Sequence, residues 1–163
     1  MGTDMPERGS PDVRGQYVFR PATGDDAPAV TGLVDAAYGH YVARIGGLPG
    51  PMRADYRRVI SDNVVTLCVT QGSVVGLIVL AVTSDGFLVE NVAVHPSQQG
   101  RGLGRALLEF ADGEARRAGF DSIYLYTHEK MTENLALYRR LGYIEYDRRS
   151  EAGFSRVFLR KRL

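Results

Sequence analysis

The sequence predicts one mixed α/β domain in which helices flank a central sheet. Segments with apolar residues at helical spacing alternate with β-branched runs, and turns rich in Gly or Pro separate them. A chain of 163 residues supports one substantial core and is short for two ordinary domains. We therefore expect residues 16–163 to form a single domain. Residues 1–15, which are polar and rich in Gly and Pro, are expected to be a disordered tail.

The predicted elements follow the order βαα, βββ, αβ, αββ. The strands, rich in β-branched and aromatic residues, are predicted at Gln16–Arg20, Asn63–Thr70, Ser73–Thr83, Phe87–His95, Ser122–Thr127, Tyr143–Arg148 and Ser155–Arg160. The helices, each with an apolar face, are predicted from the cap residues Thr23–Asp26 to about Tyr41, and at Met52–Ile60, Leu103–Ala118 and Met131–Leu141. Gln71-Gly72 is typical of a hairpin turn, and Gly119 and Gly142 are typical helix stops. The three consecutive strands are expected to pair antiparallel.

Composition narrows the function classes. The formal net charge is +1, so bulk electrostatics does not indicate a nucleic-acid partner. No apolar run approaches the length of a membrane span, and no membrane partner is expected. Cys68 is the single cysteine, so we expect it to be a reduced core residue in a cytoplasmic protein. The three histidines lack a metal-ligand spacing, so no metal is expected.

The segment QGRGLG, between a predicted strand and a predicted helix, has the composition of an anion site. Its glycines let the backbone approach a ligand closely, and the first turn of the next helix offers free N–H groups. Arg101 and Arg105 add positive charge. Because Ala106 follows Arg105, the segment is not a Walker A loop, and its glycine spacing does not match a dinucleotide fingerprint. The predicted ligand is a phosphate or pyrophosphate.

This segment closely resembles motif A of the GCN5-related N-acetyltransferases, whose pattern is Q/R-x-x-G-x-G/A. VENVAVHP precedes it and an amphipathic helix follows. The resemblance implies a twisted, mostly antiparallel sheet flanked by about four helices, and it implies acetyl-CoA as cosubstrate. It assigns pyrophosphate binding to Gln99, Gly100, Arg101, Gly102, Leu103, Gly104 and Arg105. It also implies that the strand carrying Val92, Ala93 and Val94 splays from its neighbour, so that its main chain bonds the acetyl and pantetheine amides.

A second segment, Thr127–Tyr143, resembles motif B of the same family. Asn134 and Tyr138 are four residues apart and share a helix face. The resemblance implies that Asn134 holds the pantetheine arm and that Tyr138 protonates the departing thiolate. A thiol has a pKa near 8.5 and a tyrosine near 10, so the tyrosine keeps its proton at neutral pH. Taken alone, a tyrosine on an amphipathic helix is usually a packing residue.

Glu90 is the candidate general base. Strict alternation along its strand places it on one face with Leu88 and Val92, where desolvation would raise the pKa of its carboxyl. Family members often carry a glutamate at this point of the strand, acting through water. A paired structural charge is the alternative reading, and the residues alone do not decide between them.

The predicted function is transfer of acetyl from acetyl-CoA directly to a primary amine of a small molecule, an amino acid or a peptide. The chain has no GxSxG elbow, so a covalent acyl-enzyme is not favoured. A non-catalytic acyl-CoA-binding sensor and a transferase of longer acyl groups are the alternatives. The resemblance places acceptor selectivity in Tyr38–Tyr56 and the last hairpin. There Asp55 would attract a cation and Arg44 a carboxylate, so both acceptor types stay open. A homodimer is compatible with this reading.

Overall fold

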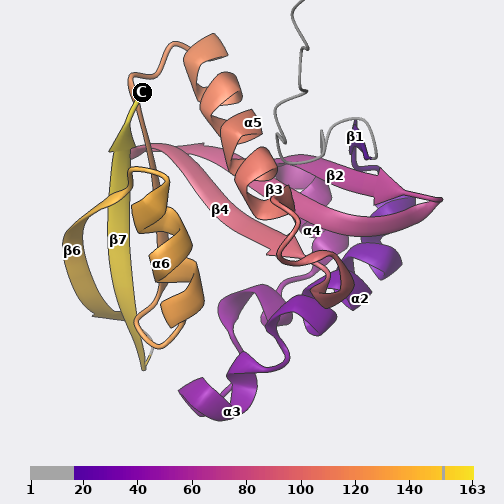
Figure 1. The fold of residues 1–163 in the computed structure, drawn as a ribbon, viewed down its shortest axis with the longest axis horizontal. Helices are drawn as coiled ribbons and strands as arrows, with labels where there is room; N and C mark the ends of the chain where they lie inside the picture. The colour runs from indigo at the N-terminus through magenta and orange to yellow at the C-terminus, as the bar shows by residue number, and fades with distance from the viewer. Residues whose placement is uncertain (1–16, 152) are drawn as a thin grey trace, which may run out of the picture.

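The structure is a computed structural model, built around a seven-stranded sheet with the order β1-β2-β3-β4-β5-β7-β6 (Figure 1). It describes residues 17–151 and 153–163, so the predicted tail at 1–15 lies outside the described residues. The strands are β1 (Val18–Pro21), β2 (Val64–Thr70), β3 (Ser73–Thr83), β4 (Gly86–Val94), β5 (Ser122–His128), β6 (Ile144–Glu151) and β7 (Phe154–Arg162). All pair antiparallel except β4 and β5, which are parallel. The predicted mostly antiparallel sheet is confirmed.

The α-helices are α2 (Ala27–Tyr38), α3 (Tyr41–Ile45), α4 (Tyr56–Asp62), α5 (Leu103–Arg117) and α6 (Thr132–Arg140), with 3-10 turns η1 (Gly24–Asp26), η2 (Gly50–Arg53) and η3 (Pro96–Gln98). Two predicted helices are divided. The first ends at Tyr38, and the separate helix α3 begins at Tyr41, after a turn in which Val42 N donates to Gly39 O at 3.2 Å. The second is interrupted because the Asp55 side chain accepts from Arg57 N at 3.1 Å and caps a new helix.

The β2–β3 hairpin has the predicted turn. Gln71 and Gly72 have φ angles of 48° and 77°, the left-handed pair that a two-residue type I′ turn requires. The pairing of Thr70 with Ser73 closes the hairpin directly behind this turn.

Apolar side chains fill both faces of β3. Ile78 and Leu80 belong to a core formed with α5 and α6, whereas Leu77 and Val79 belong to a core formed with α2 and α4. In Figure 1, α6, β6 and β7 lie to the left of α5, and β1 and β2 lie to its right. None of the helices in the described part of the chain is both long and apolar enough to cross a membrane.

The sheet divides between β4 and β5. Their parallel ladder joins Phe87, Leu88 and Val89 to β5 and then ends. On the other edge of β4, Val79 pairs with Asn91 and Leu80 pairs with Val89, which leaves Glu90 as an extra residue in a β-bulge. Beyond the bulge, β4 stays with β3 and leaves β5. The splay that the family resemblance implied is confirmed.

Gly76 sets how closely α5 approaches the sheet, and this gives a stability prediction. A Cβ on Gly76 would lie 3.0 Å from Cys68 Cβ and 3.3 Å from Leu107 Cδ1. We expect Gly76→Ala to lower the free energy of unfolding by about 1–3 kcal/mol through overpacking. Gly32→Ala in α2 is the control: its Cβ meets open space, so we expect a gain of about 0.5–1 kcal/mol from helix propensity. Urea unfolding measures both, and a stabilised Gly76→Ala would contradict this packing.

Candidate active site

Two cavities meet where β4 leaves β5. The larger has a volume of about 580 Å³ and lies between α2, β4, α6 and the loop before α5. The smaller, about 250 Å³, lies towards η2, β5 and β7. Tyr38, Val92 and Tyr138 line both cavities. The two cavities therefore adjoin at the divided part of the sheet. We call the larger one the groove and the smaller one the pocket.

The glycine loop forms one end of the groove. Gly100 and Gly102 have φ angles of 77° and 82°, and Gly102 is the N-cap residue of α5. These left-handed conformations turn the chain so that the first N–H groups of α5 meet the groove. The predicted residues that line the groove are Val92, Ala93, Val94, Gln99, Gly100, Gly102, Leu103, Gly104, Arg105 and Asn134. The geometry suits a phosphate-sized anion.

The two predicted arginines of this loop lie differently. Arg101 is exposed and is not among the groove-lining residues. Arg105 lines the groove, but its Nε lies 3.0 Å from Glu109 Oε1, one turn further along α5. Arg140, at the end of α6, also lines the groove. At the glycine-loop end of the groove, the main-chain N–H groups are thus held in place more firmly than the arginine side chains.

The main chain of β4 faces the groove beyond the bulge. His95 N donates to Val75 O at 2.8 Å, so His95 points towards β3. Because peptide groups alternate in direction along an antiparallel pair, Val92 and Val94 point away from β3, to the side that β5 has left. The two carbonyls support this direction: Val92 O lies 3.0 Å from the Tyr38 hydroxyl, and Val94 O accepts from Gln99 Nε2 at 3.2 Å.

Tyr138 lies at the junction of the groove and the pocket. Its side chain is buried, and burial raises the pKa of its hydroxyl above the ordinary value. Within residues 17–151 and 153–163, that hydroxyl makes no hydrogen bond, so a ligand at the junction would find it available. Asn134 lies one turn earlier on α6 and faces the groove, with its Nδ2 3.8 Å from Met131 Sδ. The predicted pair therefore shares this site.

Glu90 lines the pocket, but the environment predicted for it is wrong. The bulge at Glu90 breaks the alternation of β4: Val89 packs in the core under α5, and Asn91, two residues later, bonds to α2 on the other face. Leu88 and Val92 therefore do not share one face with Glu90. The Glu90 side chain is exposed instead of buried among apolar neighbours. No cation among the described residues forms an ion pair with it.

A buried polar network that the sequence did not reveal fixes η2 beside the pocket. The Tyr38 hydroxyl lies 2.7 Å from Asn91 Oδ1, and Asn91 Nδ2 donates to the Tyr56 hydroxyl at 3.3 Å. The Tyr56 hydroxyl donates in turn to Pro51 O at 2.6 Å. These bonds join α2, β4, α4 and η2. The only sequence signal was a single asparagine within an apolar strand.

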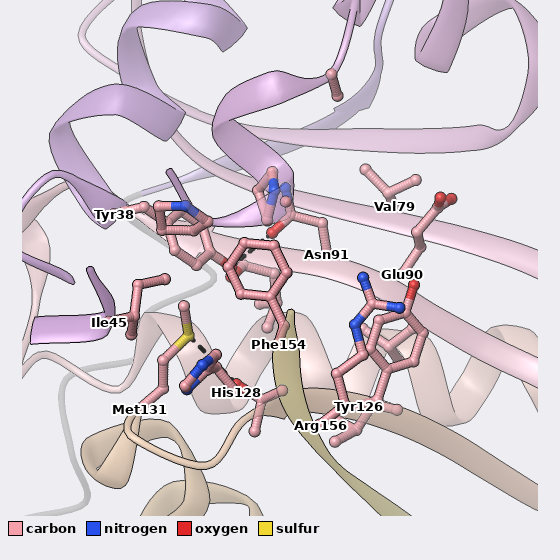
Figure 2. Close-up of a pocket in the computed structure, with 18 of the residues that line it drawn as sticks. Tyr38, Ile45, Val79, Glu90, Asn91, Tyr126, His128, Met131, Phe154 and Arg156 are labelled. Atoms are coloured by element: carbon pink, nitrogen blue, oxygen red, sulfur yellow. Dashed lines mark hydrogen bonds between the residues drawn. The ribbon is translucent and has the colours of Figure 1, made fainter. Parts of the chain in front are cut away.

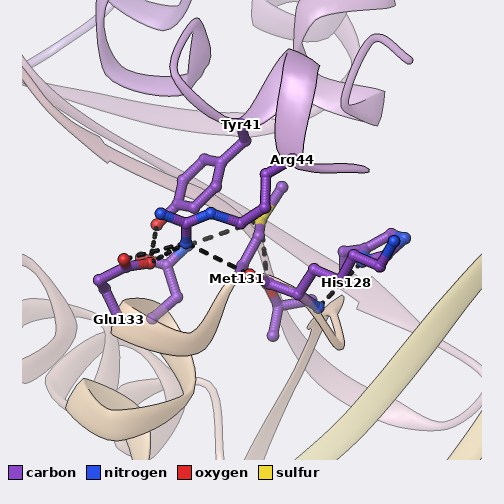
Figure 3. A network of polar contacts seen from close by, with 8 residues as sticks. Tyr41, Arg44, His128, Met131 and Glu133 are labelled. Carbon is purple, nitrogen blue, oxygen red and sulfur yellow. Dashed lines mark hydrogen bonds and ion pairs between the residues drawn. The ribbon is translucent and has the colours of Figure 1, made fainter. Parts of the chain in front are cut away.

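A second network, shown in Figure 3, joins α3 to α6, and its residues Tyr41 and Glu133 line the groove. Arg44 Nη1 of α3 lies 2.7 Å from Glu133 Oε2 of α6, and the Tyr41 hydroxyl donates to the same oxygen at 3.1 Å. The Arg44 guanidinium lowers the pKa of Glu133 to about 2. An exposed pair of this kind adds little stability. It does tie α3 to the residue that precedes Asn134.

The comparisons with known proteins agree with this geometry. The model of the acetyltransferase (GNAT) domain matches residues 61–145. An IAA acetyltransferase of Azospirillum brasilense is 36% identical over 76 residues, 45% of this chain and 50% of the relative. A ribosomal protein bS18 alanine N-acetyltransferase of Escherichia coli is 34% identical over 74 residues, with the same two shares. The chain thus spans about half the length of these curated relatives.

A solved structure shows the same fold over nearly the whole chain. The GNAT family acetyltransferase of Elizabethkingia anophelis, with acetyl-CoA bound, superposes with a TM-score of 0.71 at 19% identity. The match covers 91% of this chain and 99% of that one. At this identity the likeness concerns the fold. Together with the domain match, which spans more than half of the sequence, it shows that the chain belongs to the GCN5-related N-acetyltransferase (GNAT) family.

Proposed function

We propose that this chain transfers an acetyl group from acetyl-CoA directly to a primary amine, with Tyr138 as the general acid. The observation that carries the proposal is the position of Tyr138, whose buried side chain borders both the groove and the pocket. A donor there can reach a leaving group that enters from the groove while an acceptor occupies the pocket.

The groove has the features that acetyl-CoA needs. The N–H groups at the start of α5 would bind the pyrophosphate. The main chain of Val92 and Val94 would form hydrogen bonds with the amides of the pantetheine arm and with the acetyl carbonyl. Asn134 would contact the pantetheine arm from α6. Arg101 and Arg105 would add long-range attraction for the phosphates. When bound, acetyl-CoA supplies the activated acetyl thioester.

The protons of the reaction can be assigned to side chains of this site. Glu90, at the pocket, would take a proton from the acceptor ammonium, directly or through water, and pass it to solvent. The freed nitrogen then bonds to the acetyl carbon as the carbon–sulfur bond breaks, and the electron pair of that bond stays on sulfur. Tyr138 O–H would donate its proton to the sulfur. The second proton lost by the nitrogen restores the tyrosine through solvent.

Burial determines the pH range over which Tyr138 can donate. Because burial raises the pKa of this hydroxyl, Tyr138 stays protonated throughout neutral pH and beyond its ordinary value near 10. The same burial makes the hydroxyl a weaker acid. Its proton is therefore transferred only as charge develops on the sulfur.

Several finer expectations remain proposals of ours. We expect a cytoplasmic enzyme, which agrees with the buried free thiol of Cys68. A homodimer and a single domain over residues 16–163 also stay predictions. The two curated relatives act on different acceptors according to their names, so the acceptor of this chain has to be inferred from its own pocket.

The first functional prediction concerns Tyr138. Tyr138→Phe deletes the donor and keeps the ring, so we expect acetyl transfer in a single turnover to slow by about 10²-fold. Tyr143→Phe is the matched control. Tyr143 is also buried, its ring centroid lies 5.9 Å from that of Tyr138, and its hydroxyl has no partner among the described residues. We expect the control to keep the wild-type rate. A Tyr138→Phe rate equal to that of Tyr143→Phe would make Tyr138 a packing residue.

Glu90→Gln tests the general base. Glutamine keeps the shape of the side chain but cannot accept the ammonium proton, so turnover should fall and the acidic limb of the pH–rate profile should disappear. Acetyl-CoA affinity should be unchanged, because Glu90 lines the pocket and not the groove. Full activity with the same acidic limb would assign the base to water or to another side chain.

Gly102→Ala tests the glycine loop. A methyl group there would obstruct the approach of the pyrophosphate, so acetyl-CoA affinity measured by calorimetry should fall about tenfold or more, some 1.4 kcal/mol. Gly119→Ala, after α5, is a matched control because its φ of 86° is close to the 82° of Gly102. Both substitutions should lose similar stability, about 1 kcal/mol, through backbone strain. Equal acetyl-CoA affinities for the two variants would exclude this loop from the site.

A further inference from the structure

The charges of the pocket are uneven. Its wall is largely apolar and aromatic, and includes the rings of Tyr38, Tyr56, Tyr126 and Phe154. Apart from tyrosines, the ionisable side chains among its described lining residues are Glu90, His128 and Arg156. The balance of these three groups decides which charge a bound acceptor can carry.

Arg156 is already neutralised by the protein. Its Nη1 lies 2.7 Å from Glu151 Oε2, and its guanidinium carbon lies 5.1 Å from the centroid of the Tyr126 ring. The carboxylate comes from β6, and the aromatic face from β5. Figure 2 shows Arg156 and Tyr126 together on one side of the pocket. A substrate carboxylate would have to share this cation with Glu151.

The surroundings of His128 favour the neutral form of its ring. Burial lowers the pKa of its imidazole, and Nδ1 accepts a hydrogen bond from Lys130 N at 3.0 Å. Its ring lies edge-on to Phe154, with 5.9 Å between the centroids. His128 therefore adds an aromatic wall to the pocket and no positive charge.

Glu90 is the one lining carboxylate of the described pocket, and no described cation pairs with it. Burial is the largest cause of the raised pKa of Tyr56, and the charges of Asp35 and Glu90 add to it. At Tyr126, where burial again raises the pKa most, Arg156 opposes the effect of Glu90. Among the described ionisable side chains that line the pocket, the unpaired charge is thus negative. An ammonium group gains from this charge and from the aromatic faces.

We infer that the acceptor is a small primary amine on an aryl or alkyl body that carries no acid group. The volume of about 250 Å³ is below the ~300–1,000 Å³ of typical ligand pockets, so the body must be small. An α-amino acid would place its carboxylate beside Glu90, and the described lining residues offer it no unpaired cation, so binding costs desolvation and repulsion. The inference rests on the proposed acetyl transfer and narrows its acceptor.

A panel of acceptors with one aromatic body tests this inference. With acetyl-CoA and wild-type protein, we would measure kcat/KM for phenethylamine, for phenylalanine, and for the free N-terminus of a Phe-Gly-Gly amide. We expect phenethylamine to exceed phenylalanine by about tenfold or more, since only the second carries the carboxylate. Equal or better use of phenylalanine, or preference for the peptide, would overturn the inference while leaving acetyl transfer intact. Acetyl-CoA binding without acetylation of any amine would overturn the proposed function instead, and the inference with it.

Two hairpin variants test the charge balance itself. Glu151→Gln releases Arg156 at the pocket, so kcat/KM for phenylalanine should rise several-fold relative to phenethylamine. Asp147→Asn is the matched control. Asp147 Oδ2 lies 2.7 Å from Arg149 Nε, and the guanidinium carbon of Arg149 lies 4.4 Å from the centroid of the Phe158 ring. Arg149 and Phe158 are not among the residues that line the pocket. The control should leave the ratio unchanged. The same ratio in both variants would show that neutralised Arg156 is not what excludes acids.

Discussion

The β-bulge at Glu90 is the constraint on which the site depends. One extra residue in β4, placed between the pairs Val79–Asn91 and Leu80–Val89, coincides with the end of the ladder between β4 and β5. Beyond it, peptide groups that a continuous sheet would pair are turned towards the groove. The fold thus creates a ligand site by leaving one edge of a central strand without a neighbour.

The bulge also determines which side chains meet. It moves Asn91 to the face under α2, where it bonds to Tyr38 and joins the network that holds η2 over the pocket. It leaves Glu90 exposed at the edge of that pocket. Tyr138 reaches the same point from α6, on the other side of the division. The groove, the pocket and the proposed proton donor therefore converge because β4 changes the direction of its side chains at one residue.

Local patterns predicted the fold well. Glycines, cap residues and strand-like runs found every strand, the hairpin turn at Gln71-Gly72, and the glycine loop before α5. The spacing of Asn134 and Tyr138 correctly put both on one helix face, since four residues on a helix span about one turn, and both line the groove. What failed was non-local. Strict alternation around Glu90 ignored the bulge, which depends on pairing with β3, and the Asn91 network depends on contacts across 35 and 53 residues of sequence.

A crystal structure of the chain with acetyl-CoA would test the central claim most directly. We predict that the pyrophosphate lies at the N-terminus of α5, that the pantetheine arm follows Val92–Val94, and that the thioester sulfur lies within about 4 Å of the Tyr138 hydroxyl. The acetyl group should face the pocket beside Glu90. A cofactor bound with its sulfur away from the junction, or outside the division between β4 and β5, would contradict this account.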